Sequence, residues 1–61
     1  MTPNDVERVY DALAETLDRV GMKKSELFLA QLAMLLANEI GDVGNVLRLV
    51  HMASHNLEVT S

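Results

Sequence analysis

The chain has 61 residues, a formal net charge of −4 and no cysteine. A chain of this length forms one domain, 1–61, and buries only about 60% of the surface that its unfolded form exposes. Without cysteine there are no disulfides or thiolate metal sites, so association with another chain is the expected way to complete a core. The acidic balance argues against nucleic acid as a partner, because binding to phosphates needs a basic patch.

The composition favours an all-α fold. Hydrophobic residues make up 49% of the chain but aromatic residues only 3%, so the core must consist mainly of the aliphatic side chains typical of helix packing. The first helix is predicted over 3–20, with Thr2 as its cap, Pro3 at its first position and Gly21 just beyond its end. Its apolar residues recur at intervals of three and four and form one stripe: Val6, Val9, Tyr10, Leu13, Leu17 and Val20.

The second helix, predicted over 25–40 with Ser25 as its cap, is apolar around almost its whole circumference. Its segment 27–36, LFLAQLAMLL, contains Gln31 as its single polar residue, whereas a surface helix has a polar face about half its circumference wide. The apolar run is much shorter than the roughly 20 residues that a membrane span needs. No signal peptide is recognised at the N-terminus either. We therefore expect a cytoplasmic protein without a membrane partner.

The third helix is predicted over 42–57, with Asp42 as its cap directly after Gly41. The short Gly-Asp connection predicts a sharp corner between the second and third helices. Its inward stripe is predicted to contain Val43, Val46, Leu47, Val50, Ala53 and Leu57. Leu49 and Met52 lie outside that stripe and are candidates for a second contact surface.

These patterns predict a small three-helix unit that forms a homodimeric helical bundle with the second helix at its centre. The leucine side of that helix can pack on its own chain, while its alanines allow a helix of the second copy to approach closely. Two alternatives stay open, a monomeric three-helix bundle and a larger, different protein that covers the apolar surface. The predicted interface residues are Phe28, Ala30, Gln31, Ala33, Met34, Ala37, Asn38, Leu49 and Met52.

Residues suited to catalysis are scarce, and we expect neither an enzyme nor a bound cofactor. His51 and His55 are four residues apart, a spacing that can present two imidazoles to one metal ion, with Glu58 as a conceivable third ligand. The simpler interpretation is a pair of surface histidines without a metal. A row of carboxylates on the first helix is predicted to face solvent and could dock a basic surface: Glu7, Asp11, Glu15 and Asp18.

The segment 35–42, LLANEIGD, preceded by Tyr10-Asp11-Ala12-Leu13, resembles a family of short uncharacterised bacterial proteins, a domain of unknown function. Members have about the length of this chain, and the resemblance implies an accessory role beside oxidoreductases. We therefore predict a non-catalytic helical interaction protein that self-associates and serves as an accessory or regulatory subunit of a larger cytoplasmic partner. The alternative is a small metal- or ligand-binding module with its site at the subunit interface or at His51 and His55.

Overall fold

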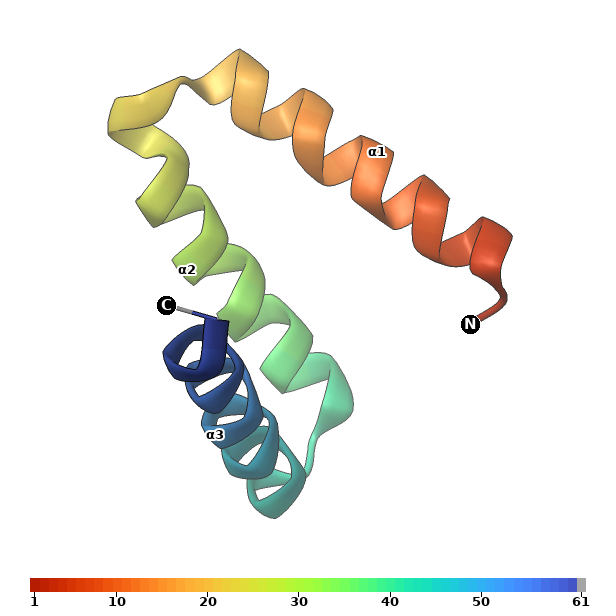
Figure 1. Ribbon diagram of the computed structural model, residues 1–61, viewed down its shortest axis with the longest axis vertical. Coiled ribbons are helices and arrows are strands. Elements are labelled where there is room, and N and C mark those ends of the chain that lie inside the picture. Colours follow the sequence, from red (N-terminus) through yellow and green to blue (C-terminus); the bar gives the residue numbers. More distant parts are fainter. Residues whose placement is uncertain (61) are drawn as a thin grey trace. The chain divides into compact units, whose positions relative to one another are not determined.

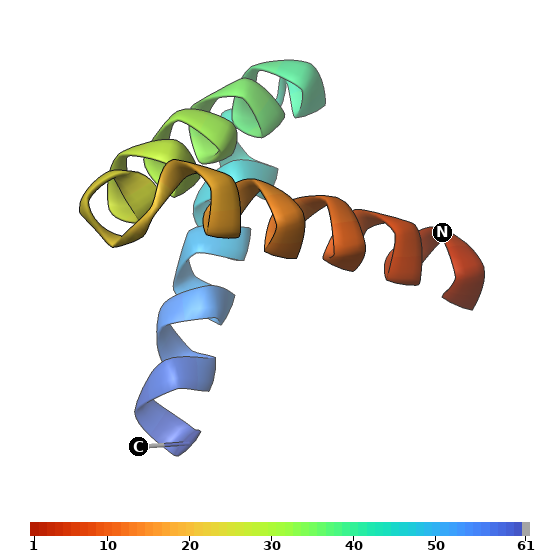
Figure 2. The same cartoon turned by 90° about the horizontal axis from the view of Figure 1, so that it is seen from above.

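The computed structural model describes the backbone of residues 1–60 and the side chains of residues 1–58. The fold is all-α, as predicted, with three helices: α1 (Pro3–Val20), α2 (Met22–Ile40) and α3 (Val43–Thr60) (Figure 1). Each helix is continuous along its length in both views (Figure 1 and Figure 2). Within the described range, none of the helices is long and apolar enough to cross a membrane.

The chain divides into two compact units. The first, Met1–Gln31, contains α1 and the first half of α2, and the second begins at Leu32 and contains the rest of α2 together with α3. Each unit therefore holds one junction between two helices, at Gly21 in the first unit and at Gly41 and Asp42 in the second. That 1–61 behaves as one domain stays a prediction.

α1 spans the residues predicted for the first helix, and its start is fixed by a capping box. The Thr2 hydroxyl oxygen accepts a hydrogen bond from the Asp5 backbone N–H at 3.1 Å, and the Thr2 backbone N–H donates to the Asp5 carboxylate at 3.2 Å. Pro3 occupies the first helical position, where its missing N–H costs nothing. These contacts satisfy donors that the first turn leaves without partners in the helix.

The junction between α1 and α2 is a single residue, Gly21. Its φ of 81° and ψ of 168° fall in a backbone region that is essentially restricted to glycine, rather than in the left-handed helical region usual for a glycine at a helix end. Because Gly21 redirects the chain by itself, α2 starts at Met22, three residues before the predicted start. Ser25 is therefore not a cap: it lies inside the helix, and its hydroxyl donates to the Gly21 carbonyl at 2.8 Å.

The junction between α2 and α3 consists of Gly41 and Asp42. Gly41 has a φ of 73°, and its N–H donates to the Ala37 carbonyl at 3.0 Å, which closes the last turn of α2. The Asp42 carboxylate accepts hydrogen bonds from the Gly44 backbone N–H at 3.0 Å and from the Asn45 side-chain amide at 3.1 Å. Asp42 thus caps α3, which starts at Val43 and continues to Thr60, three residues past the predicted end.

Substitutions at two glycines should have opposite effects on stability: Gly21 forms the first junction, and Gly44 lies within α3. At Gly21 an added Cβ meets nothing within 4 Å, so Gly21→Ala is disfavoured by backbone strain alone, and we expect it to lower the free energy of unfolding by about 1–3 kcal/mol. Gly44 lies inside α3 without a positive φ, so Gly44→Ala should raise that free energy by about 0.5–1 kcal/mol.

Urea denaturation of both variants at one protein concentration measures these effects, with the helix signal followed by circular dichroism. Equal changes of the same sign at the two positions would contradict the role assigned to the Gly21 backbone.

Candidate interaction surface

Apolar side chains on all three helices remain accessible to water. None of the residues 1–58 is fully buried, and contiguous exposed apolar surface on a small soluble protein usually marks a contact site. The most buried apolar residues are few: Leu13, Leu17, Val20, Phe28, Leu32, Ala37 and Val46. The candidate functional site is therefore a surface for association.

The most apolar part of this surface is a groove in the second unit, which we call the α2–α3 groove. It is a hollow of about 280 Å³ whose eight lining residues are all aliphatic: Ala33, Leu36, Ala37, Ile40, Val46, Leu49, Val50 and Ala53. Four of these residues come from α2 and four from α3. In each set the later residues follow the first by three, four and seven positions, which places the set on one face of its helix. Leu36 and Val50 still expose 55% and 60% of their surface.

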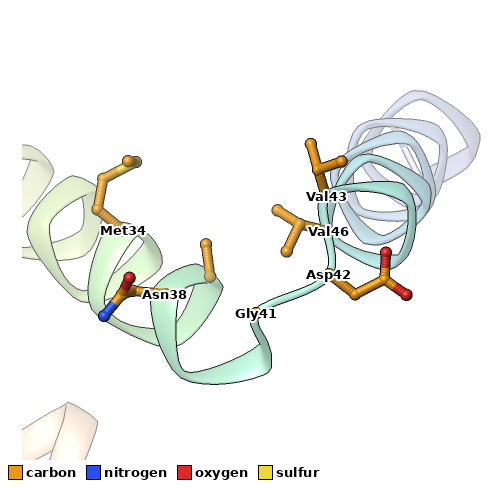
Figure 3. Close-up of a pocket in the computed structure, with 7 residues that line it drawn as sticks. Met34, Asn38, Gly41, Asp42, Val43 and Val46 are labelled. Carbon is orange, nitrogen blue, oxygen red and sulfur yellow. The ribbon is translucent and has the colours of Figure 1, made fainter.

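A second hollow of about 420 Å³, the junction hollow, lies beside Gly41 and Asp42 in the same unit. In Figure 3, Met34 and Asn38 lie on α2 on one side of the connection, and Val43 and Val46 lie on α3 on the other. Ala37 and Val46 line both hollows, so the α2–α3 groove and the junction hollow are adjoining parts of one surface. Asn38 brings a side-chain amide to this otherwise largely apolar surface.

The structure brings five of the nine predicted interface residues to the second unit's two hollows. Ala33, Ala37 and Leu49 line the α2–α3 groove, and Met34, Ala37 and Asn38 line the junction hollow.

The other four lie elsewhere. Phe28 and Gln31 belong to a smaller hollow of the first unit, about 170 Å³ in volume. Ala30 is exposed. Met52 is also exposed, and its sulfur accepts a contact from Arg48 Nη1 at 3.4 Å.

The sequence patterns predicted that five of the eight groove residues pack inside the chain. Leu36 and Ile40 on α2, and Val46, Val50 and Ala53 on α3, were expected to face inward, yet all except the half-buried Val46 are exposed. Three further members of the predicted inward stripe, Val43, Leu47 and Leu57, are exposed as well. Helical periodicity shows which side chains share a face but not which chain covers that face. The sequence did contain one signal for the groove: the aliphatic rows of α2 and α3 have the same spacing along the chain.

None of the polar candidates lines either of these hollows. The rings of His51 and His55 stack on α3 with centroids 6.4 Å apart and planes inclined by 12°, and the four carboxylates of α1 are exposed: Glu7, Asp11, Glu15 and Asp18. Within the described part of the chain, no group of three or more histidine, cysteine or acidic side chains is placed to hold a metal ion. Glu58 is thus not gathered with the two histidines into a three-ligand site.

No protein-family model, curated protein or solved structure matches this chain. The fold defines the class, a small all-α protein of three helices. A fold of this kind is compatible with many functions, so the function has to be argued from the surface of the chain itself.

Proposed function

We propose that the chain is a non-catalytic helical interaction protein that self-associates through the α2–α3 groove and the adjoining junction hollow. The observation that carries the proposal is the composition of the groove, in which two rows of aliphatic side chains from two helices face water without a charged group among them. Removing such surface from water is the main driving force of association.

The free energy gained by burying the groove residues indicates how much apolar surface a stable dimer must cover. Leu36, Ile40, Leu49 and Val50 expose between 41% and 60% of their surface. Completing their burial in two copies gives on the order of 8 kcal/mol. Association costs an estimated 4–15 kcal/mol in lost translational and rotational freedom. The groove alone therefore gives at best a weak dimer, and a stable one must also cover the junction hollow, where Met34 is 71% exposed.

A second copy suits this surface for two reasons. Ala33, Ala37 and Ala53 are small lining residues, so a helix of another copy can approach the backbone closely. The groove lining is also uncharged, and Asp42, the carboxylate of the junction hollow, accepts hydrogen bonds from Gly44 and Asn45 of its own chain. Two chains with a net charge of −4 can therefore meet at the groove without bringing carboxylates into it. A two-fold axis would use the same patch on both copies, which places α2 at the centre of the assembly.

The acidic row of α1 lines neither hollow of the second unit and offers a surface for a further partner. The exposed carboxylates of α1 follow one another at intervals of three and four residues, and such a row can dock a basic protein surface. The resemblance of segment 35–42 to proteins that accompany oxidoreductases supports an accessory role beside a larger cytoplasmic enzyme. In this proposal the chain contributes contacts and no catalytic group.

Light scattering over a wide dilution series tests self-association directly. We expect a species of twice the 6.7 kDa chain mass at high concentration, dissociating on dilution as a dimer held by hydrophobic contacts does. A 6.7 kDa species at every concentration would contradict the proposal. It would assign the apolar surface to intrachain packing or to a different protein, and a pull-down from native lysate would then distinguish these two alternatives.

A charge placed in the groove should break the dimer. Val50→Glu puts a carboxylate among aliphatic residues, and because a buried charge needs a partner, we expect dimer dissociation to become easier by about a hundredfold or more. Met22→Glu is the matched control: the same charge is added at a side chain that is 94% exposed and lines neither hollow. Sedimentation equilibrium measures both, and equal effects of the two substitutions would exclude the groove as the interface.

Asn38 in the junction hollow supplies a separate prediction about register. If its amide forms a hydrogen bond across the seam, it fixes one alignment of the helices, as a buried asparagine does in coiled coils. Asn38→Leu should then keep or raise the stability of the assembly but produce a mixture of oligomeric states, seen by native mass spectrometry. A uniform dimer of unchanged stability would show that Asn38 has no such role.

A further inference from the structure

His51 and His55 form a side-chain pair that the proposed self-association does not use. They stand one turn apart on α3, both are exposed, and their imidazole rings lie nearly parallel with centroids 6.4 Å apart. Imidazole is the commonest protein ligand for transition metals, and two of them at this helical spacing can reach one ion. The question is whether the observed geometry is close to that of a chelate.

The distance between the two rings is compatible with one shared ion. A ligating histidine nitrogen lies about 2.0–2.1 Å from Zn²⁺, which places each ring centroid about 3.2 Å from the metal and two ligating rings at most about 6.4 Å apart. The observed separation equals that limit, which only a linear N–metal–N arrangement reaches; a tetrahedral ion needs the two ring centroids about 5 Å apart, so the rings must turn towards each other. Since both side chains are exposed, rotation between staggered conformers can turn their nitrogens towards a common point at little cost.

The pair also lies on a different face of α3 from the groove. At 100° per residue, the average direction of His51 and His55 is about 170° away from that of Val46, Leu49, Val50 and Ala53. A second copy seated in the groove therefore leaves the imidazoles accessible to an ion from solution. The net charge of −4 raises the local concentration of cations around the chain.

The nearest cationic side chain on this face is engaged with a neighbour. Arg48 lies one turn before His51 and points its Nη1 at the Met52 sulfur, 3.4 Å away. This contact holds the guanidinium beside Met52. Its positive charge therefore does not have to occupy the space where the two imidazoles would bind a metal ion.

We propose that His51 and His55 form a bidentate site for a divalent transition-metal ion of the Zn²⁺, Ni²⁺ or Cu²⁺ class. One ring nitrogen of each histidine binds the ion, and water completes its coordination because both rings are exposed. The helix holds the second imidazole close to an ion bound by the first, and such linkage strengthens binding by about a hundredfold or more over a single ligand. Hard cations such as Mg²⁺ and Ca²⁺ prefer oxygen ligands and are not bound there.

Metal binding at this pair stabilises α3. The two imidazoles are one turn apart only while residues 51–55 are helical, so the ion binds the helical form in preference to the unfolded chain. Zn²⁺ should therefore raise the thermal midpoint of the helix signal, and Mg²⁺ at the same concentration should not. This effect belongs to a single chain and does not depend on the proposed dimer.

The test exchanges His55 with its neighbour. In the double variant His55→Asn, Asn56→His, the composition is unchanged but the histidines are five residues apart and point about 140° away from each other. Isothermal titration of the full chain, free of any polyhistidine tag, with ZnCl₂ and NiCl₂ should give one ion per chain and at least tenfold weaker binding in the exchanged variant. His51→Gln should weaken binding to the same extent.

Each outcome decides the proposal. Equal metal affinity in the original and the exchanged chain, or retained binding in His51→Gln, would overturn it. Circular dichroism shows whether the exchanged variant keeps its helix content, and if it does not, the single variants His51→Gln and His55→Gln take its place. The Val50→Glu chain should bind Zn²⁺ with unchanged affinity, so that a failure of the dimer proposal and a failure of the metal site are told apart.

Discussion

Aliphatic side chains on α2 and α3 have to be shielded from water, and this requirement shapes the rest of the structure. Leu36, Leu49 and Val50 are each more than two-fifths exposed although two helices of their unit meet around them. Junctions of one and two residues hold the helices together, so the chain devotes nearly all its length to helical faces. Those faces supply more apolar surface than the groove encloses, and the proposed self-association would cover part of the remainder.

The chemistry on α3 is divided between two faces. One face contributes the four aliphatic residues of the groove, and the face nearly opposite carries His51, His55 and the Arg48–Met52 contact. An amphipathic helix commonly separates packing from polar contacts in this way. The proposed association and the proposed metal binding can therefore occur together, because neither needs the side chains of the other.

Local signals in the sequence predicted the helices well where a specific side chain fixes a boundary. Thr2 and Asp42 make the capping hydrogen bonds expected of them, and Asp5 adds a reciprocal bond to the Thr2 backbone N–H. The prediction that Ser25 caps α2 was wrong, because the conformation of Gly21 allows α2 to begin at the next residue, Met22. The serine hydroxyl then donates a hydrogen bond to the Gly21 carbonyl. A serine near a helix start can fulfil either role, and the backbone angle of the preceding residue decides between them.

The sequence by itself determined that the chain is all-α, where glycine ends its first two helices, and that α2 has too little polar surface for an ordinary surface helix. Five of the nine predicted interface residues line the two adjoining hollows. Only the tertiary structure decided that Ala33, Leu36, Ala37 and Ile40 meet an equally spaced row on α3 and leave a groove between them. The reason is physical: periodicity orders side chains around one helix axis, whereas a groove depends on how two axes meet.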